Sequence, residues 1–392
     1  MEKVLLGDVL DVQRGASLSG EFYSESGNRI RLTLGNFNYP SGGFKQNTSK
    51  KDIYFTGSIN PKFILKKGDL ITPLTEQVAG LLGTTAFIPE DDVYIQSGDI
   101  GLVTTKENRL LKGYAYYLLN SSIIKRQLGA SAQQTKIRHT SPDAIKSCVA
   151  WIPSLDQQLR ITNILGTIDK KININKQMIG LLDNYLSTVF DYKYITYKGE
   201  DLIWNENVKK HIPKDWQVYC LGELFSFVKG KIPAQLKDRH EDVYDSIYLT
   251  IDTINGGQEL YCSSVNMPYS KGNVLMVMDG AASGDVYVGF DGVVGSTFCM
   301  LKTKQSFVSN TFLYQILRSY STNYKKTNVG STVPHANKDY IQSMQIALPK
   351  EIDMEFDLVR NQIIQLTKQI KALKKIRDFL LPLLVNGQVK VQ

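Results

Sequence analysis

Cysteine is scarce in this 392-residue sequence, and its four occurrences stand alone. Residues 148, 220, 262 and 299 form no Cys-x-x-Cys pair, so we expect neither a disulfide framework nor a structural zinc site. No window reaches the roughly 18 apolar residues of a membrane-spanning helix, and the charged start is unlike a signal peptide. These absences predict a cytoplasmic protein without a membrane partner, long enough for two or three domains.

Recognisable catalytic motifs are also lacking. The run Asn60–Phe63 approaches the Asn-Pro-Pro-aromatic loop of amino methyltransferases, but Lys62 replaces the second proline and no glycine-rich cofactor loop precedes it. Pro142–Asp143 is more typical of a helix start capped by Ser141 than of a nuclease site. Gly280–Gly284 lacks the Gly-Lys-Ser/Thr of a phosphate-binding loop and is expected to be a turn. With four dispersed histidines, the sequence predicts no catalytic, cofactor-binding or metal-binding residues.

The charge balance is basic. Lysine and arginine number 46 against 38 aspartates and glutamates, which gives a formal net charge of +8. A balance of this sign suits a polyanionic partner such as nucleic acid, although many soluble proteins carry a similar charge.

Two long heptad patterns are the strongest signal in the chain. In each, apolar residues alternate four and three apart, which is the a/d seam of a coiled coil. The first pattern follows Pro153 and the second follows Pro349. The seam positions expected at the helix–helix interface are Ile161, Leu165, Ile168, Ile172, Asn175, Ile179, Leu182 and Leu186 in the first helix and Ile363, Leu366, Ile370, Leu373, Arg377 and Leu380 in the second.

Asn175 and Arg377 interrupt the apolar seam. Either they fix the register of the helices, since a polar seam residue penalises slipped pairings, or they lie at the seam edge. For Arg377 we favour the edge, with the side chain reaching toward Asp169 and Ile376 taking the inward place. For Asn175 both interpretations stay open.

The two halves of the sequence repeat one pattern. Leu6–Asp8 matches Leu221–Glu223, and Lys67–Ile71 matches Lys271–Leu275. The offset between matched residues falls from 215 at the start to 196 at the two prolines, so the first domain is about 19 residues longer. One fold is therefore expected twice, with different loops.

We predict an α+β protein with two mostly β domains in tandem, separated by two long antiparallel coiled-coil helices with pseudo-two-fold symmetry. If the helices overlap fully, facing residue numbers sum to 545, and a helix of ~36 residues spans roughly 54 Å. Pro382 should kink or end the second helix, which makes Leu384 its least secure seam position. The expected segments are a domain at 1–153, a helix at 154–190, a connector at 191–210, a domain at 211–349 and a helix at 350–386.

Basic and amide side chains recur in matched loops of the two halves. Cations neutralise phosphates, whereas Gln, Asn and Arg can read base edges. At the offset of 196, His139 falls on His335. Any one of these residues is more simply a solvated surface side chain, so only the recurrence supports a DNA interface. The candidate DNA-binding residues are Lys45, Lys50, Lys51, Gln134, Lys136, Arg138, His139, Lys229, Lys231, Lys325, Lys326, Thr332, His335, Asn337 and Lys338.

Taken in order along the chain, these features resemble the specificity subunit of type I restriction-modification systems. The resemblance rests on the repeat of domain plus long helix, on the opening IPKDWQVYCLGELFSFVKG at Ile212–Gly230 and on the run IPSLDQQLRITNIL at Ile152–Leu165. It spans nearly the whole chain. The first domain lacks the Ile-Pro-x-x-Trp opening, and the second helix begins KEIDMEFDLV without the glutamine pair, which weakens the expected partner contact at that end.

The resemblance implies a non-catalytic subunit whose two domains each read one half of a bipartite target in double-stranded DNA. The paired helices would set the unread spacer and dock two methyltransferase subunits, which would carry S-adenosylmethionine. Restriction subunits would then join that core, and this chain itself would bind no cofactor. The competing interpretations are a coiled-coil protein-interaction scaffold without DNA specificity and a stand-alone methyltransferase or nuclease.

Overall fold

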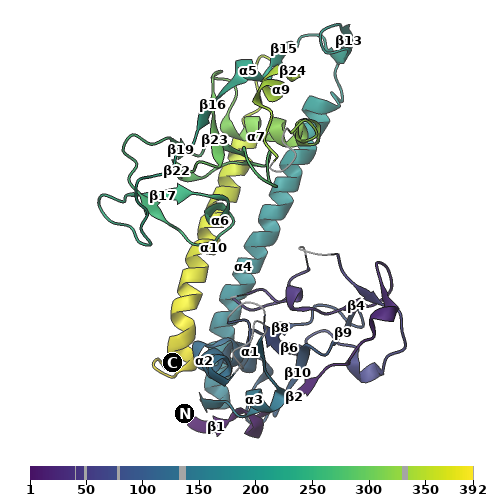
Figure 1. Ribbon diagram of the computed structural model, residues 1–392, viewed down its shortest axis with the longest axis vertical. Coiled ribbons are helices and arrows are strands. Elements are labelled where there is room, and N and C mark those ends of the chain that lie inside the picture. Colours follow the sequence, from purple (N-terminus) through teal and green to yellow (C-terminus); the bar gives the residue numbers. More distant parts are fainter. Residues whose placement is uncertain (40, 48–50, 77–79, 132–137, 329–333, 392) are drawn as a thin grey trace. The chain divides into compact units, whose positions relative to one another are not determined.

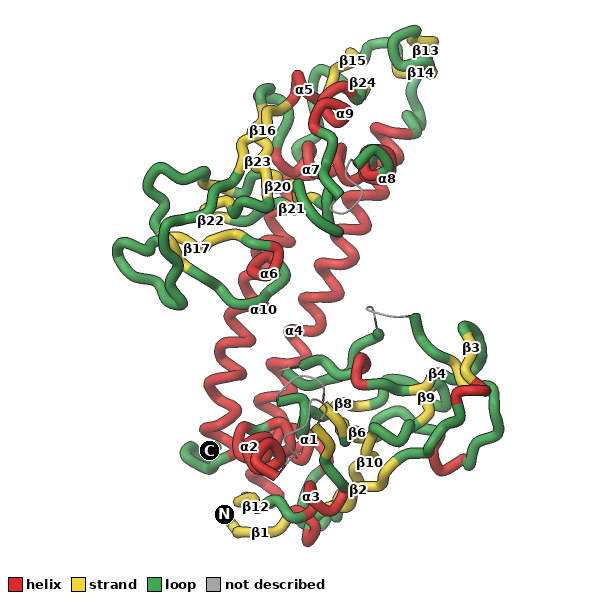
Figure 2. The backbone as a smooth tube through the Cα atoms, in the orientation of Figure 1, coloured by secondary structure: helices red, strands yellow, loops and turns green. Residues whose placement is uncertain are grey.

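The computed structural model describes residues 1–391 apart from 40, 48–50, 77–79, 132–137 and 329–333. Figure 1 shows the chain coloured along its sequence, and Figure 2 shows its helices and strands. The contacts divide the chain into two compact units, of which unit 1 is Met1–Asn173 with Lys371–Gln392 and unit 2 is Ile174–Ile370. Unit 1 therefore draws on both ends of the sequence.

Unit 1 is built around an antiparallel sheet in the order β2-β10-β6-β8, whose inner strand β6 is buried along its whole length. A second sheet has the order β3-β5-β4-β9 and pairs β4 with β9 in parallel. Two ribbons, β1 with β12 and β7 with β11, complete the strands. The strands are β1 (Glu2–Leu5), β2 (Leu10–Arg14), β3 (Tyr23–Ser24), β4 (Ile30–Arg31), β5 (Tyr54–Phe55), β6 (Leu70–Pro73), β7 (Thr75–Glu76), β8 (Ala86–Phe87), β9 (Tyr94–Ile95), β10 (Ile100–Thr105), β11 (Arg138–His139) and β12 (Val149–Ile152).

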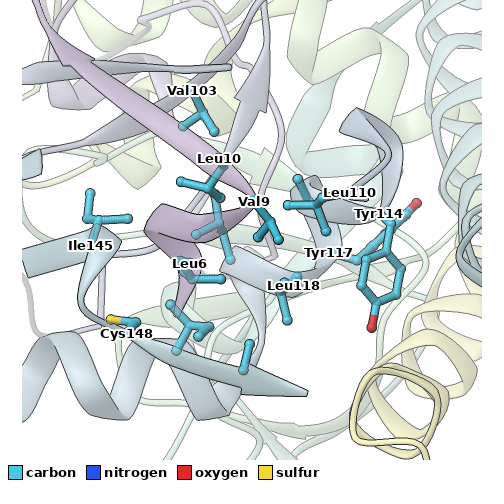
Figure 3. Packing of buried hydrophobic residues seen from close by; sticks show 14 of the residues in the cluster. Leu6, Val9, Leu10, Val103, Leu110, Tyr114, Tyr117, Leu118, Ile145 and Cys148 are labelled. Carbon is cyan, nitrogen blue, oxygen red and sulfur yellow. The ribbon is translucent and has the colours of Figure 1, made fainter. Parts of the chain in front are cut away.

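Three short helices pack on these strands, namely α1 (Lys112–Asn120), α2 (Ser122–Ser131) and α3 (Pro142–Lys146). Ser141 caps α3 as predicted, because its hydroxyl accepts from the Ala144 amide at 3.0 Å while Pro142 occupies the first turn. Tyr114 and Tyr117 of α1 belong to the same buried cluster as Leu6 of the first 3-10 turn and Leu10 of β2, as Figure 3 shows. Single 3-10 turns lie at Leu6–Asp8, Gly20–Phe22, Leu34–Asn36 and Pro61–Phe63.

Unit 2 repeats this plan. Its main sheet has the order β16-β23-β20-β21, a second sheet pairs β17 with β22 in parallel in the order β18-β17-β22-β19, and β15 pairs with β24. Its short helices are α5 (Leu221–Leu224), α6 (Ile251–Ile254), α7 (Asn310–Ser319), α8 (Ser321–Lys325) and α9 (Lys338–Ser343). The strands are β15 (Gln217–Cys220), β16 (Phe225–Lys229), β17 (Ser246–Leu249), β18 (Tyr261–Cys262), β19 (Tyr269–Lys271), β20 (Val274–Val277), β21 (Val286–Tyr287), β22 (Asp291–Val294), β23 (Phe298–Thr303) and β24 (Gln345–Leu348).

The predicted repeat is present in the main sheets and in the pairs β1 with β12 and β15 with β24, whereas the second sheets differ in one edge strand. The strands β2 and β16 begin 215 residues apart, and β12 and β24 begin 196 residues apart. Unit 2 also holds the connector, a short π-helical turn at Asp191–Ile195 followed by the hairpin β13 (Leu202–Asn205) and β14 (Lys210–Pro213). The predicted fold class, two mostly β domains with two long antiparallel helices, is confirmed.

The two long helices are α4 (Leu155–Phe190) and α10 (Glu355–Val385). Within unit 1, Asp169 of α4 contacts Arg377 of α10, and within unit 2, Asn175 contacts Gln369, so the helices run antiparallel in both units. These pairs sum to 546 and 544, close to the predicted 545. Every predicted seam position is buried or half-buried.

The second helix ends at Val385, within one turn of Pro382, as expected. One expectation needs correction, because Leu384 is buried in the core of unit 1 rather than insecure. The turn after the proline persists because Leu384 and Val385 pack among buried residues of the first domain. Along the part of the chain that the structure describes, no helix is both long and apolar enough to cross a membrane. Cys148, Cys220, Cys262 and Cys299 are all free thiols.

Candidate nucleic-acid interface

The two histidines that the repeat aligns occupy equivalent backbone positions. In unit 1, His139 of β11 pairs with Thr75, two residues after β6 ends. In unit 2, His335 forms an antiparallel bridge with Asp279, two residues after β20 ends. Both imidazoles are exposed. The recurrence at the offset of 196 is therefore a shared structural position.

The partner of the histidine differs between the units. In unit 2, Nδ1 of His335 lies 2.6 Å from Oδ1 of Asp279, and about half of each side chain is exposed. A carboxylate in this place accepts the Nδ1 proton and fixes the tautomer, which leaves Nε2 of the neutral ring as an acceptor. Thr75 stands at the equivalent place in unit 1 and carries no charge. Of the two aligned histidines, His335 is the one that a carboxylate among the described residues orients.

A glycine-rich turn gathers the candidate residues of unit 2. The segment Asp279–Asp285 connects β20 to β21, as predicted for this stretch. At its start Asp279 holds His335, and at its end Asp285 forms an ion pair with Lys325 of α8. The Asn328 amide donates to the carbonyl of Ser283 at 3.1 Å. The two candidate segments, near 325 and near 335, thus meet at one turn.

Asp279 and Asp285 are not among the predicted residues. A signal for them existed, because a carboxylate flanks the glycine-rich run DGAASGD at each end. Without the fold, nothing connects these carboxylates with Lys325 and His335, which lie 40 and 56 residues further along the chain.

Several other predicted residues in unit 2 have structural roles. Oδ1 of Asn337 accepts from the Tyr340 amide at 3.0 Å, so this side chain caps α9. The Lys338 ammonium lies 5.5 Å from the ring centroid of Phe227, a cation–π contact. The Lys231 ammonium reaches the carbonyl of Asn266 at 3.4 Å. Lys229 and Lys326 are exposed.

In unit 1 the predicted residues are dispersed. Lys45 is exposed, and Lys51 pairs with Glu25 at 3.3 Å, where both side chains are 83% exposed and the pair adds little stability. Lys50, Gln134, Lys136 and Thr332 (the last in unit 2) lie outside the described residues, and of Arg138 only the backbone is described. The structure therefore brings candidates together around the unit 2 turn but not in unit 1.

A lysine reaches the equivalent turn in each unit. In unit 1, Nζ of Lys125 in α2 donates to the Thr84 hydroxyl at 3.1 Å, just before β8. Burial lowers the pKa of Lys125 to about 8, although the Glu76 carboxylate acts in the opposite direction. In unit 2, Lys325 pairs with Asp285 just before β21 and is exposed. The same position is half-buried in one unit and exposed in the other.

Charged side chains connect each domain to the helix pair. In unit 1, Asp169 accepts from the Tyr117 hydroxyl of α1 at 2.8 Å and from Arg377 of α10 at 3.2 Å. Arg377 also contacts its neighbour Asp378 at 2.8 Å. Burial alone would lower the pKa of Arg377, but the two carboxylates raise it overall. We call Tyr117, Asp169 and Arg377 the unit 1 clasp.

Unit 2 has a corresponding arrangement. Asp183 of α4 accepts from Arg318 of α7 at 2.6 Å and from Arg360 of α10 at 3.3 Å. Arg360 is 8% exposed, and its guanidinium stacks over Tyr314 at 4.8 Å. We call Arg318, Asp183 and Arg360 the unit 2 clasp. In both clasps the carboxylate comes from α4 and the buried arginine from α10.

The two polar seam residues can now be placed. Asn175 is fully buried, and its Nδ2 donates to Gln369 at 3.1 Å. Arg377 reaches Asp169 as expected, but the expectation that Ile376 takes the inward place is wrong, since Ile376 is 48% exposed and Arg377 only 8%. Carboxylates on both sides of the guanidinium make its burial tolerable. Among the described residues, no group of three or more His, Cys, Asp or Glu side chains could hold a metal ion.

Comparisons with known proteins agree with this division into two similar halves. The family model for the type I restriction modification DNA specificity domain matches residues 1–183 and again 213–375. The MjaIX type I restriction enzyme specificity subunit of Methanocaldococcus jannaschii is 23% identical over 299 residues, which cover 71% of this chain and 69% of that protein.

Other relatives match over different lengths. The MjaVIII specificity subunit of the same organism is 26% identical over 184 residues, so the match covers 44% of this chain and only 43% of the relative. A solved type I restriction-modification S subunit from M. genitalium is similar over 98% of this chain and 96% of its own, with a TM-score of 0.62 and 16% identity. At that identity the structural likeness concerns the fold.

Proposed function

Because this chain belongs to the family of type I restriction modification DNA specificity domains, we propose that it is the DNA sequence-recognition subunit of a type I restriction-modification complex. Each unit reads one half of a bipartite duplex target, and the paired helices set the unread spacer. The observation that supports this most is the repeated strand order, which carries one exposed histidine at the same bridge in both units but surrounds it with different side chains.

The proposed chemistry is divided between subunits. This chain supplies recognition and takes no part in bond making, and two methyltransferase subunits dock on the helices and hold S-adenosylmethionine. Restriction subunits join that core. The clasps support a rigid attachment of each domain to the helices. In each clasp, an aspartate of α4 accepts hydrogen bonds both from a short helix of the domain and from a buried arginine of α10.

Sequencing of methylated adenines in the host genome tests this proposal. A bipartite motif with an unread spacer should be methylated when the chain is present and unmethylated when its gene is deleted. Exchanging residues 1–150 for the first domain of another family member should then change one half of the motif only. A change in both halves would contradict independent reading, and an unchanged motif would remove DNA recognition from this chain.

The spacer role is tested by lengthening the helices. Inserting four residues, about one turn, near Gly180 of α4 and near the facing Gln365 of α10 keeps the seam paired and should alter the spacer length. A side chain at Gly180 would meet no atom within 4 Å, so this position tolerates change. The control is the α4 insertion alone, which misaligns the seam. An unchanged spacer length with both insertions would show that the helices do not set it.

A binding assay separates DNA recognition from a scaffold role. The purified chain, with and without a co-expressed methyltransferase subunit, is titrated with the duplex found by methylation sequencing and with a scrambled duplex of equal length. Preference for the target duplex supports the proposal. Equal binding of both duplexes by the assembled complex would favour the scaffold.

A further inference from the structure

The middle of the long helices carries lysines without acidic residues. Residues 170–182 of α4 contain three lysines, and residues 358–377 of α10 contain four lysines and two arginines, yet neither stretch contains an aspartate or glutamate. The pattern concentrates positive charge at the helix centres.

Four of these lysines lie around one contact in unit 1. Asp169 and Arg377 are joined at 3.2 Å, so the antiparallel helices bring Lys170 and Lys171 to the level of Lys374 and Lys375, within a turn of the clasp. All four are exposed. We call these four residues the mid-helix lysines.

Nothing described nearby neutralises the mid-helix lysines. The adjacent carboxylates, Asp169 and Asp378, are both engaged by Arg377. None of the four lysines forms an ion pair with any residue that the structure describes. A cluster of exposed ammonium groups that form no ion pair with the described residues fits an external polyanion.

We propose that the mid-helix lysines bind backbone phosphates of the unread spacer in double-stranded DNA. This inference rests on the proposed function, which lays one duplex along the helices between the two half-sites. Lysine ammonium groups on flexible stems suit phosphates, because they supply charge without demanding a base sequence. The spacer is unread, so contacts there have to be of this kind. The helices are then a part of the DNA-binding surface.

The test uses the full chain and a duplex carrying the target found by methylation sequencing. In the variant, Lys170, Lys171, Lys374 and Lys375 are all changed to Gln, which retains helix propensity. The control variant changes Lys3, Lys198, Lys214 and Lys390, which are also exposed, to Gln and so alters the net charge equally. Circular dichroism verifies that both variants keep their helix content.

Salt dependence is the first measurement. Each phosphate contact contributes about 0.9 to the slope of log K against log salt concentration. In the mid-helix variant, the magnitude of this slope should fall by about 3 to 4. The variant should bind roughly ten- to hundredfold more weakly at low salt and keep its sequence preference in both half-sites. The control should keep the wild-type slope. An unchanged slope in the variant, or an equal loss in the control, would overturn the inference.

The second measurement places the contact on the spacer. A duplex with uncharged methylphosphonate linkages in the spacer alone should weaken binding of the wild type but not of the mid-helix variant. If the variant instead keeps its DNA affinity and loses the methyltransferase subunit on co-purification, the lysines bind an acidic protein surface and the inference is wrong. A wild type that prefers no sequence at all would contradict the proposed function itself, which is a separate outcome.

Discussion

In unit 1, Lys125 of α2 lies half-buried against Thr84, whereas in unit 2, Lys325 of α8 lies exposed against Asp285. The same contrast holds for the histidine bridges, where Thr75 faces His139 but Asp279 orients His335. The strand order around these residues is shared. One framework therefore carries two different polar surfaces, which is what two independent readers of different half-sites require.

The clasps differ in how well their buried arginine is paired. Arg377 keeps Asp378 at 2.8 Å in addition to Asp169, whereas Arg360 has Asp183 as its carboxylate partner and shares it with Arg318. Unit 2 thus depends on one carboxylate where unit 1 has two.

The largest effect is expected from Asp183→Ala. The change leaves Arg360 buried without a carboxylate and should lower the free energy of unfolding of unit 2 by about 3 kcal/mol, since truncating one partner of a buried ion pair is strongly destabilising. Asp169→Ala is the matched variant and should cost about 1 kcal/mol, because Asp378 still pairs Arg377. Urea unfolding followed by Trp216 for unit 2 and Trp151 for unit 1 measures both. Equal losses would contradict the asymmetry.

His335→Ala should relax base preference at one position of the half-site read by unit 2. A good base contact provides about 1 to 3 kcal/mol of discrimination, and we expect about 2 kcal/mol here. Asp279→Asn should cause part of the same loss, because a neutral amide holds the Nδ1 proton of His335 less firmly than a carboxylate does. Competition binding with duplexes substituted one base pair at a time gives the profile. The control, His139→Ala, should affect the other half-site only, and a loss in both would refute separate readers.

Asn175→Leu should stabilise the helix pair by about 1 kcal/mol, because Oδ1 of Asn175 is buried and has no hydrogen-bond partner among the residues that the structure describes. Thermal unfolding measures the change. Gln369→Leu, at the other end of the same hydrogen bond, is the control and should not stabilise, since it leaves Asn175 with no partner at Nδ2. If Asn175→Leu lowered the melting temperature, the asparagine would stabilise the helix pair and not only fix its register.

The smallest effect concerns pH. The pKa of Lys125 is about 8 in the folded chain, whereas the ordinary pKa of a lysine is 10.5, so the unfolded state binds more protons between these limits. The stability of unit 1 should therefore rise with pH from about 8 upward, by less than about 1 kcal/mol per pH unit after solvent screening. Lys125→Met should remove this slope, and Lys325→Met should leave it unchanged. The midpoints of urea unfolding at several pH values measure this dependence. A stability that falls as the pH rises above about 8 would contradict the burial of Lys125.

The helices and the repeat were predictable because their signals are regular. A heptad seam persists over tens of residues, and its burial outweighs single exceptions such as Arg377. The matched strands were found because both copies lie in one sequence. The contacts of the polar residues were not predictable. Asp183 with Arg360, and Asp279 with His335, join residues 177 and 56 positions apart, and no local pattern encodes such pairs.

The expectation for Ile376 failed for a physical reason. Preferring an apolar residue inward is sound when a guanidinium would be buried alone. Here Asp169 and Asp378 both contact Arg377, so the paired guanidinium takes the inward place and Ile376 is left exposed. The sequence shows both aspartates, but it does not show that they converge.

Unit 1 is built from both ends of the chain, so it cannot fold completely until the end of the chain has been synthesised. Its last segment supplies contacts that the first domain needs, because Gln157 exchanges hydrogen bonds with the backbone of Val391 and Leu384 lies in the first domain's core. About 200 residues separate the two parts of unit 1, and a ribosome adds 5 to 20 residues per second, so the nascent first domain waits roughly 10 to 40 s for completion. During that interval its half of the helix seam is exposed to other nascent chains and to chaperones.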